Sequence, residues 1–145
     1  MGSVVTGTGS DGIEALQNSG GAFKITVDGT VTGRGESGGG DCKGCPEELG
    51  FGIKAFNRDG DSTEIGIGGA GLVQGVTAGI YAKSYETQSI TITNGGIVRN
   101  LSALSDSYAV VTVGAATKID NTGDIIGTVK FGAYNDTVNN DGLWS

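Results

Sequence analysis

The sequence predicts an all-β fold, a right-handed parallel β-helix (a solenoid) of about five turns, and three observations support this prediction. The chain repeats itself, with identical residues recurring at shifts of 27 and 40. Each repeat contains short apolar or alternating stretches rich in Val, Ile and Thr, which are typical of strands. The composition of 29 glycines and one proline in 145 residues, without helix-forming runs, fits many tight bends between short strands.

The repeat is visible as three columns of identical residues that keep their register along the chain. A shift of 27 relates the later units to one another, and a shift of 40 extends each column backward. Since 40 is 27 plus 13, the first unit is expected to be the same unit with a 13-residue insertion. The columns are Ala15, Ala55, Ala82 and Ala109; Ile25, Ile65, Ile92 and Ile119; and Gly29, Gly69, Gly96 and Gly123.

Each unit is expected to contain three strands. It opens with an apolar strand such as GIKAF from Gly52, continues with an alternating strand such as FKITV or TEIGI, and closes with a stretch such as TVTG. The shared glycine supplies a positive φ or a close backbone approach at the corner. Because so short a unit cannot bury a core alone, stacked units must share one. The expected units of this single domain, 1–145, are approximately 12–51, 52–78, 79–105, 106–127 and 128–145.

A meander of hairpins is the competing fold, because Asn94 and Gly95 form a strong hairpin-turn signal. A meander requires no self-match at 27 residues, whereas a parallel solenoid places residue i directly beside residue i+27. In the solenoid Asn94 and Asn121 share a column, and we expect their inward amides to stack as a ladder. Other β-rich folds remain as alternatives.

Both ends of the sequence lack the polar capping elements that solenoids normally carry. MGS at 1–3 looks like an expression start, and NNDGLWS repeats NTGDIIG at a shift of only 19. We therefore expect an uncapped fragment of a longer protein, whose raw strand edges allow end-to-end self-association.

The repeat style resembles passenger domains of bacterial autotransporters, which are type V secreted proteins. Units of the form GI-x-A followed by alternating strands carry the resemblance, together with NDTVNNDGLW at 135–144 and SGGG at 37–40. The resemblance covers nearly the whole chain but includes no catalytic signature. It implies an extracellular or outer-cell-surface β-helix of a Gram-negative bacterium, with a role in adhesion or virulence. The implied partners are a host-cell or matrix protein or a surface glycan.

Charge and composition exclude several other functions. The chain has nine basic and sixteen acidic residues, a net charge of −7, and no basic run. Nucleic acid and anionic membrane surfaces are therefore improbable partners, because both are bound by clustered Lys and Arg. No stretch approaches the ~20 apolar residues of a membrane helix, so this segment is expected not to insert. With no histidine, Ser-His-Asp and Cys-His catalysis is not possible, and we expect no cofactor.

A carbohydrate-active β-helix, a polysaccharide hydrolase or lyase, is the main alternative function. Such enzymes need convergent carboxylates. The 27-residue register instead places Asp28 beside Gly68 and Gly95, and Asp120 beside Thr93. We therefore favour a non-enzymatic adhesin or stalk. A self-assembling filament is the third alternative, suggested by the uncapped ends.

An inserted loop at approximately 34–50 contains both cysteines and the only proline. Cys42 and Cys45 supply only two of the roughly four ligands that zinc needs, and no βαβ unit accompanies the CxxC spacing. In an oxidising extracellular setting they are expected to form a local disulfide, and in a cytosolic one to stay free thiols. The loop either contacts a partner or is a tolerated insertion. Its charged candidate contacts are Glu36, Asp41, Lys43, Glu47 and Glu48.

A weak calcium signal lies in NRDGDSTE, where Asn57, Asp59 and Asp61 occupy alternate positions. The stretch lacks the full twelve-residue calcium-loop pattern. A polar turn between strands explains it better, and no metal site is expected.

Alternation predicts one outward column of Glu14, Lys54, Tyr81 and Tyr108. Glu14 beside Lys54 would form a surface ion pair worth less than roughly 1 kcal/mol. Tyr81 beside Tyr108 would form an exposed aromatic pair. That pair would either stack on a sugar or protein ligand or simply pack between neighbouring strands.

Overall fold

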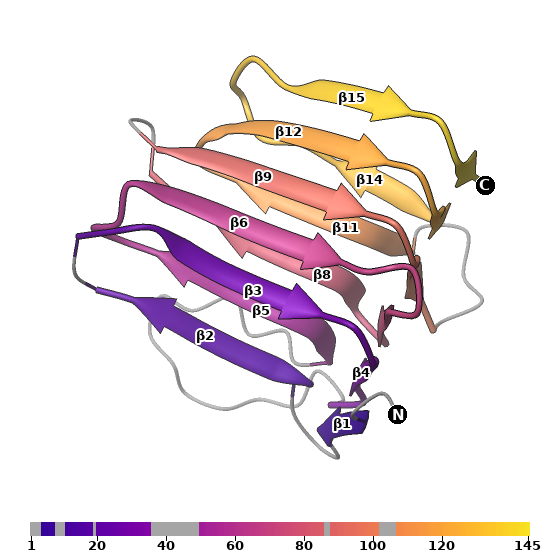
Figure 1. Ribbon diagram of the computed structural model, residues 1–145. Helices are drawn as coiled ribbons and strands as arrows, with labels where there is room; N and C mark the ends of the chain where they lie inside the picture. The colour runs from indigo at the N-terminus through magenta and orange to yellow at the C-terminus, as the bar shows by residue number, and fades with distance from the viewer. Residues whose placement is uncertain (1–3, 8–10, 19, 36–49, 86–87, 102–106) are drawn as a thin grey trace.

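The computed structural model describes residues 4–7, 11–18, 20–35, 50–85, 88–101 and 107–145. These ranges contain sixteen strands and no helix, and the strands form three parallel sheets. No described segment is a helix long and apolar enough to cross a membrane. The chain visits the three sheets in the same order again and again, which confirms the predicted parallel β-helix of about five turns (Figure 1).

Neighbouring strands in each sheet come from successive turns of the solenoid. Sheet A contains β1 (Val4–Gly7), β4 (Thr30–Gly33), β7 (Leu72–Gly75), β10 (Ile97–Asn100), β13 (Asp124–Ile126) and β16 (Leu143–Trp144). Sheet B contains β2 (Ile13–Gln17), β5 (Phe51–Asn57), β8 (Ala78–Lys83), β11 (Tyr108–Val113) and β14 (Thr128–Lys130). Sheet C contains β3 (Phe23–Val27), β6 (Ser62–Ile67), β9 (Ser89–Asn94), β12 (Ala116–Asn121) and β15 (Thr137–Asn140).

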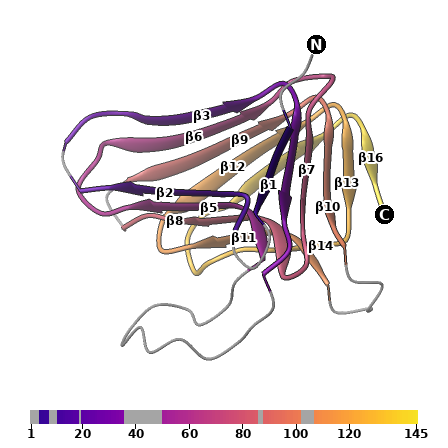
Figure 2. The ribbon, with the colours of Figure 1, turned by 90° about the horizontal axis from the view of Figure 1, so that it is seen from below.

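We call one passage through sheets B, C and A a coil, so that coil 1 is β2–β4 and coil 5 is β14–β16. Sheets B and C face each other, and sheet A closes the space between them on one side (Figure 2). Seen along the axis from coil 1, the chain turns clockwise as it moves away from the viewer, which is a right-handed path (Figure 2). This handedness agrees with the rule for parallel crossover connections.

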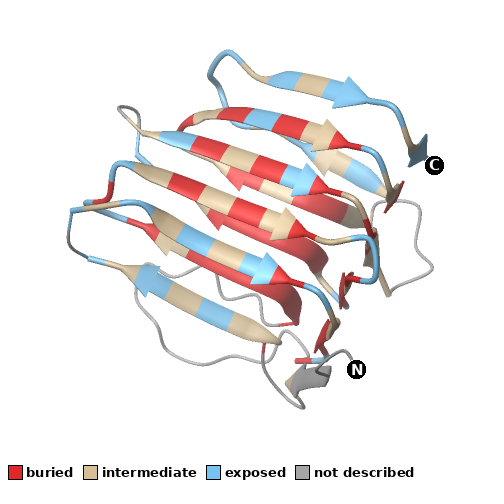
Figure 3. Ribbon diagram, in the orientation of Figure 1, coloured by how far each residue is buried: buried red, intermediate tan, exposed pale blue. Residues whose placement is uncertain are grey.

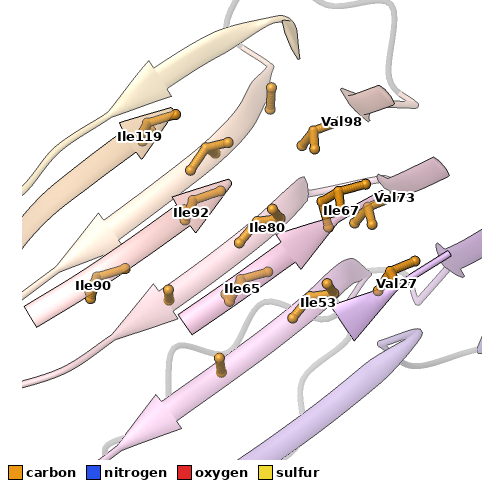
Figure 4. Packing of buried hydrophobic residues seen from close by; sticks show 14 of the residues in the cluster. Val27, Ile53, Ile65, Ile67, Val73, Ile80, Ile90, Ile92, Val98 and Ile119 are labelled. Carbon is orange, nitrogen blue, oxygen red and sulfur yellow. The ribbon is translucent and has the colours of Figure 1, made fainter. Parts of the chain in front are cut away.

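The core is built from columns of aliphatic side chains that point into the solenoid. In sheet C, Ile25, Ile65, Ile92 and Ile119 pair in register, as the sequence predicted. Ile65, Ile92 and Ile119 are at most 1% exposed, and they face the isoleucines of sheet B (Figure 4). Burial alternates along β6 and β9, whereas β5 and β8 are buried along most of their length, hence on both faces (Figure 3).

An amide ladder continues one inward column of sheet C. The Nδ2 of Asn94 donates to the Oδ1 of Asn121 at 2.7 Å, which confirms the predicted stack. The Nδ2 of Asn121 then donates to the Oδ1 of Asn140 at 2.6 Å, so the ladder has a third member. Each inner amide also contacts backbone carbonyls, and these contacts satisfy polar groups that would be costly to bury alone.

The repeat length differs between the sheets. Between coils 3 and 4 the pairing is offset by 27 residues in sheets C and A but by 30 in sheet B. The bend between β11 and β12 has only two residues, 114–115, where the bend between β8 and β9 has five, 84–88. The predicted neighbour of Ala82 is therefore wrong: Ala82 pairs with Thr112, while Ala109 lies beside Gly79.

The predicted corner glycines are partly confirmed. A Cβ on Gly96 or Gly123 would meet the backbone oxygen of the glycine in the preceding coil, so close approach explains both. Gly69 was assigned wrongly, because a Cβ there would have no neighbour closer than 3.9 Å. The longer bend of coil 2 moves the corner to Gly71, and the Leu72 amide donates to the Gly29 carbonyl. Positive φ occurs at other glycines: Gly21, Gly50, Gly114 and Gly127.

Candidate functional site

The outer surface of sheet B carries a second hydrophobic cluster, separate from the core. It arises because β5 does not alternate strictly at its start. A Cβ on Gly52 would lie 2.9 Å from Cγ1 of the core residue Val73, so Gly52 faces the core, as does its neighbour Ile53. We call the following residues the outer cluster: Phe51, Phe56, Ala78, Tyr81, Tyr108, Val111 and Val113.

Three aromatic rings form the centre of the outer cluster. The Tyr81 ring centroid lies 5.0 Å from that of Phe51 and 5.7 Å from that of Phe56, with tilted planes. Tilted contacts at such distances are favourable for aromatic pairs. Tyr81 is only 9% exposed, so it is the buried middle of the cluster and not an exposed recognition residue.

The predicted stack of Tyr81 beside Tyr108 is wrong. The 30-residue offset in sheet B pairs Tyr81 with Val111 and Tyr108 with Ala78. Tyr108 is half-buried at the edge of the outer cluster, where Lys130 Nζ lies 5.7 Å from its ring centroid. The two tyrosines thus share a surface without forming a pair.

Cations lie on this aromatic surface, although the chain as a whole is acidic. Lys54 Nζ lies 6.0 Å from the ring centroids of both Phe51 and Phe56, and Lys83 Nζ lies 5.9 Å from that of Phe56. Each such contact contributes about 0.5–1 kcal/mol where solvent reaches it and more where it does not. The aromatic and positive character of this face is therefore a property of its three-dimensional arrangement.

Lys54 also holds two carboxylates of coil 1. Its Nζ lies 3.5 Å from Oε1 of Glu14, as predicted, and 3.4 Å from Oδ2 of Asp11, which was not predicted. The Lys54 and Asp11 side chains are 7% and 3% exposed, so this ion pair is buried, unlike the surface pair that alternation suggested. The other oxygen of Asp11, Oδ1, accepts hydrogen bonds from the backbone amides of Gly50 and Phe51, each 2.9 Å long.

A groove opens on the coil 1 side of the outer cluster. It has a volume of about 430 Å³ and is lined by Glu14, Leu16, Lys54, Phe56 and Arg58. Leu16 is 54% exposed and pairs in register with Phe56, so the two form an apolar strip between charged groups. Sequence analysis did not select Leu16, Phe56 or Arg58. The available signal was the register, which places Leu16 and Phe56 at the same position of successive units.

The remaining predicted site residues do not join this surface. Glu36, Asp41, Lys43, Glu47 and Glu48, with Cys42 and Cys45, lie outside the described residues, so the disulfide stays a prediction. Asn57 of the weak calcium candidate is buried, where its Oδ1 accepts from the Gly60 amide and its Nδ2 donates to Thr63. Asp59 and Asp61 are exposed, so Asn57 secures a polar turn from within.

Carboxylates on the opposite surface are paired with lysines. Asp120 is flanked by Lys118, whose Nζ donates to its Oδ2 at 2.7 Å, and by Asn139, whose Nδ2 donates to its Oδ1 at 2.7 Å. The hydrogen bond from Lys118, and then that from Asn139, lowers the pKa of Asp120 below its ordinary value. Lys24 and Glu64 form a second exposed pair on sheet C at 3.6 Å. In the described part of the chain, no group of three acidic, His or Cys side chains is placed to hold a metal ion.

No protein-family model matches this chain, and neither a curated protein nor a solved structure matches it.

Proposed function

We propose that this chain is a non-enzymatic β-helical segment of a secreted or surface-displayed protein similar to autotransporter passengers, and that it acts in adhesion. The observation that carries the proposal is the groove beside the outer cluster. A stack of paired strands holds the groove rigid, and Leu16 presents an exposed apolar side chain within it. Rigid scaffolds with an apolar strip and a few charged groups are suited to recognition.

The charges of the groove favour an acidic partner. Lys54 is already compensated by Asp11 and Glu14, whereas Arg58 is exposed at the rim and Lys83 is half-buried over Phe56. The proposed partner is therefore an acidic patch of a host-cell or matrix protein, or an acidic surface glycan, that places an apolar or ring face on Leu16 and Phe56. Complementary charge would mainly raise the association rate and the selectivity.

Equilibrium binding to host-cell surfaces and to purified matrix proteins and acidic glycans tests the proposal. Wild-type protein should bind saturably, and Arg58→Glu should weaken the binding at least about tenfold, because it reverses the rim charge. Lys24→Glu is the matched control: it makes the same charge change on sheet C, at a side chain 67% exposed, and should bind like wild type. Equal loss in both variants, or no saturable binding at all, would contradict the adhesive role of the groove.

A version lacking residues 34–50 separates the groove from the inserted loop. If binding survives Arg58→Glu and disappears with the deletion, the contact lies in the loop. If both changes abolish binding, the loop and the groove act as one surface.

A further inference from the structure

Lys54, Asp11 and Glu14 form a compact cluster that joins coil 1 to coil 2. Lys54 Nζ lies 3.4 Å from Asp11 Oδ2 and 3.5 Å from Glu14 Oε1. Among the described ion pairs, Lys54 with Asp11 is the one in which both side chains are less than a tenth exposed. We propose that the protein itself joins Lys54 to Asp11 by an isopeptide bond, with Glu14 as the group that transfers the proton.

The surroundings of Lys54 keep water away from the reacting atoms. The Phe51 and Phe56 rings lie on either side of the ammonium, each with its centroid 6.0 Å from Nζ, and Tyr81 packs against both rings. Separated charges are expensive in such a place, which favours a neutral pair. A proton that passes from Nζ to Oδ2 produces that pair, an amine facing a carboxylic acid, and only the free amine has the lone pair needed to attack.

The other oxygen of Asp11 is held as an oxyanion would need to be. Oδ1 accepts hydrogen bonds from the backbone amides of Gly50 and Phe51, both 2.9 Å long. When Nζ adds to Cγ, negative charge grows on Oδ1, where these two donors already point. Preorganised donors of this kind stabilise tetrahedral intermediates without rearrangement. The fixed strand register supplies the second requirement, since it holds amine and acid in contact.

The reaction balances without any further reagent. The Nζ–Cγ bond forms and the Cγ–Oδ2 bond breaks, so that Oδ2 leaves as one water molecule. The Glu14 carboxylate accepts a proton from the attacking nitrogen and delivers one to the departing oxygen, as a general base and then a general acid. The Glu14 side chain is 65% exposed and lines the groove, which gives the released water a way out.

The product would be a covalent tie between the first two coils. It would close the chain between residues 11 and 54 into a loop that contains the whole insertion, and it would prevent coil 1 from peeling off coil 2. This inference goes beyond the proposed adhesive role and does not depend on it, because the bond forms whether or not the groove binds a partner.

The mass of the intact protein, measured after reduction of all cysteines, tests the proposal. Folded wild-type protein should be lighter than its sequence by the mass of one water molecule. A tryptic digest should contain a branched peptide that joins the segments around Asp11 and Lys54, with no cleavage after Lys54. Wild-type protein that folds and keeps its full sequence mass would overturn the proposal.

Four variants separate this bond from other losses of water. Lys54→Arg keeps the positive charge but should keep the full mass; Asp11→Asn should lose ammonia in place of water; and Glu14→Gln should react more slowly. Lys118→Arg is the matched control and should lose water like wild type, because the Lys118–Asp120 pair is exposed and stays ionic. Water loss that persists in Lys54→Arg would indicate a succinimide at Asp11 and Gly12 and would refute the isopeptide bond.

Discussion

The amide ladder offers the sharpest test of how the solenoid is held together. Asn121 is 1% exposed, accepts a hydrogen bond from Asn94 at 2.7 Å and donates one to Asn140 at 2.6 Å. Asn121→Ala removes both bonds. The Nδ2 of Asn94 keeps its second acceptor, the Asp124 carbonyl at 3.1 Å, so the inner amide is not left entirely unpaired. At about 1 kcal/mol for each lost bond, and somewhat more for incomplete compensation, we expect a loss of about 2–3 kcal/mol.

Asn140→Ala is the matched control, because it deletes the same kind of amide at an exposed position and should cost less than about 1 kcal/mol. Urea unfolding should be followed by far-ultraviolet circular dichroism and by fluorescence of Trp144, the only tryptophan, which reports on coil 5. Solenoids can lose a terminal coil before the rest, and the two signals would then separate. If Asn121→Ala is no more destabilising than Asn140→Ala, buried amide stacking does not stabilise this fold.

Three further outcomes follow from the structure. Gly123→Ala should destabilise by at least about 3 kcal/mol in the same unfolding assay, because its Cβ would overlap the preceding coil, whereas Gly69→Ala should stay within about 0.5 kcal/mol. Tyr81→Ala should cost about 3 kcal/mol by opening a cavity in the outer cluster, and wild-type stability there would show that the cluster is not packed. The lowered pKa of Asp120, due first to Lys118, stabilises the fold above the unfolded-state pKa and is lost as pH falls through the folded-state value; Asp120→Asn should therefore flatten the acid limb of midpoint against pH, and an unchanged limb would contradict this.

Sheet C could be predicted almost residue by residue, because two independent signals agree there. Its strands alternate strictly, and its offset between coils 2, 3 and 4 is the same 27 residues. An isoleucine column such as Ile65, Ile92 and Ile119 then follows from counting along the chain. Asn140 followed the same logic at the shorter shift of 19, which the sequence also contains.

Sheet B was harder to predict, for two physical reasons. First, the inward Gly52 leaves the alternation of its strand out of phase, and glycine gives no hydrophobic signal of its own. Second, three residues move from one bend to another between coils 3 and 4, which changes the offset to 30 while the rest of the coil keeps 27. A constant shift therefore placed Tyr108 beside Tyr81 when its partner is Ala78.

These two departures from the repeat explain where the distinctive chemistry lies. A strict repeat places identical side chains beside one another, which suits a core column but cannot bring a lysine between a carboxylate and two aromatic rings. The outer cluster needs the irregular start of β5 to place Phe51 and Lys54 on the same outer surface, and Asp11 reaches them from the neighbouring coil. Sheet B is thereby buried on both faces at its centre, as parallel sheets usually are. In a solenoid of this kind, the positions that break the repeat are therefore the first places to look for function.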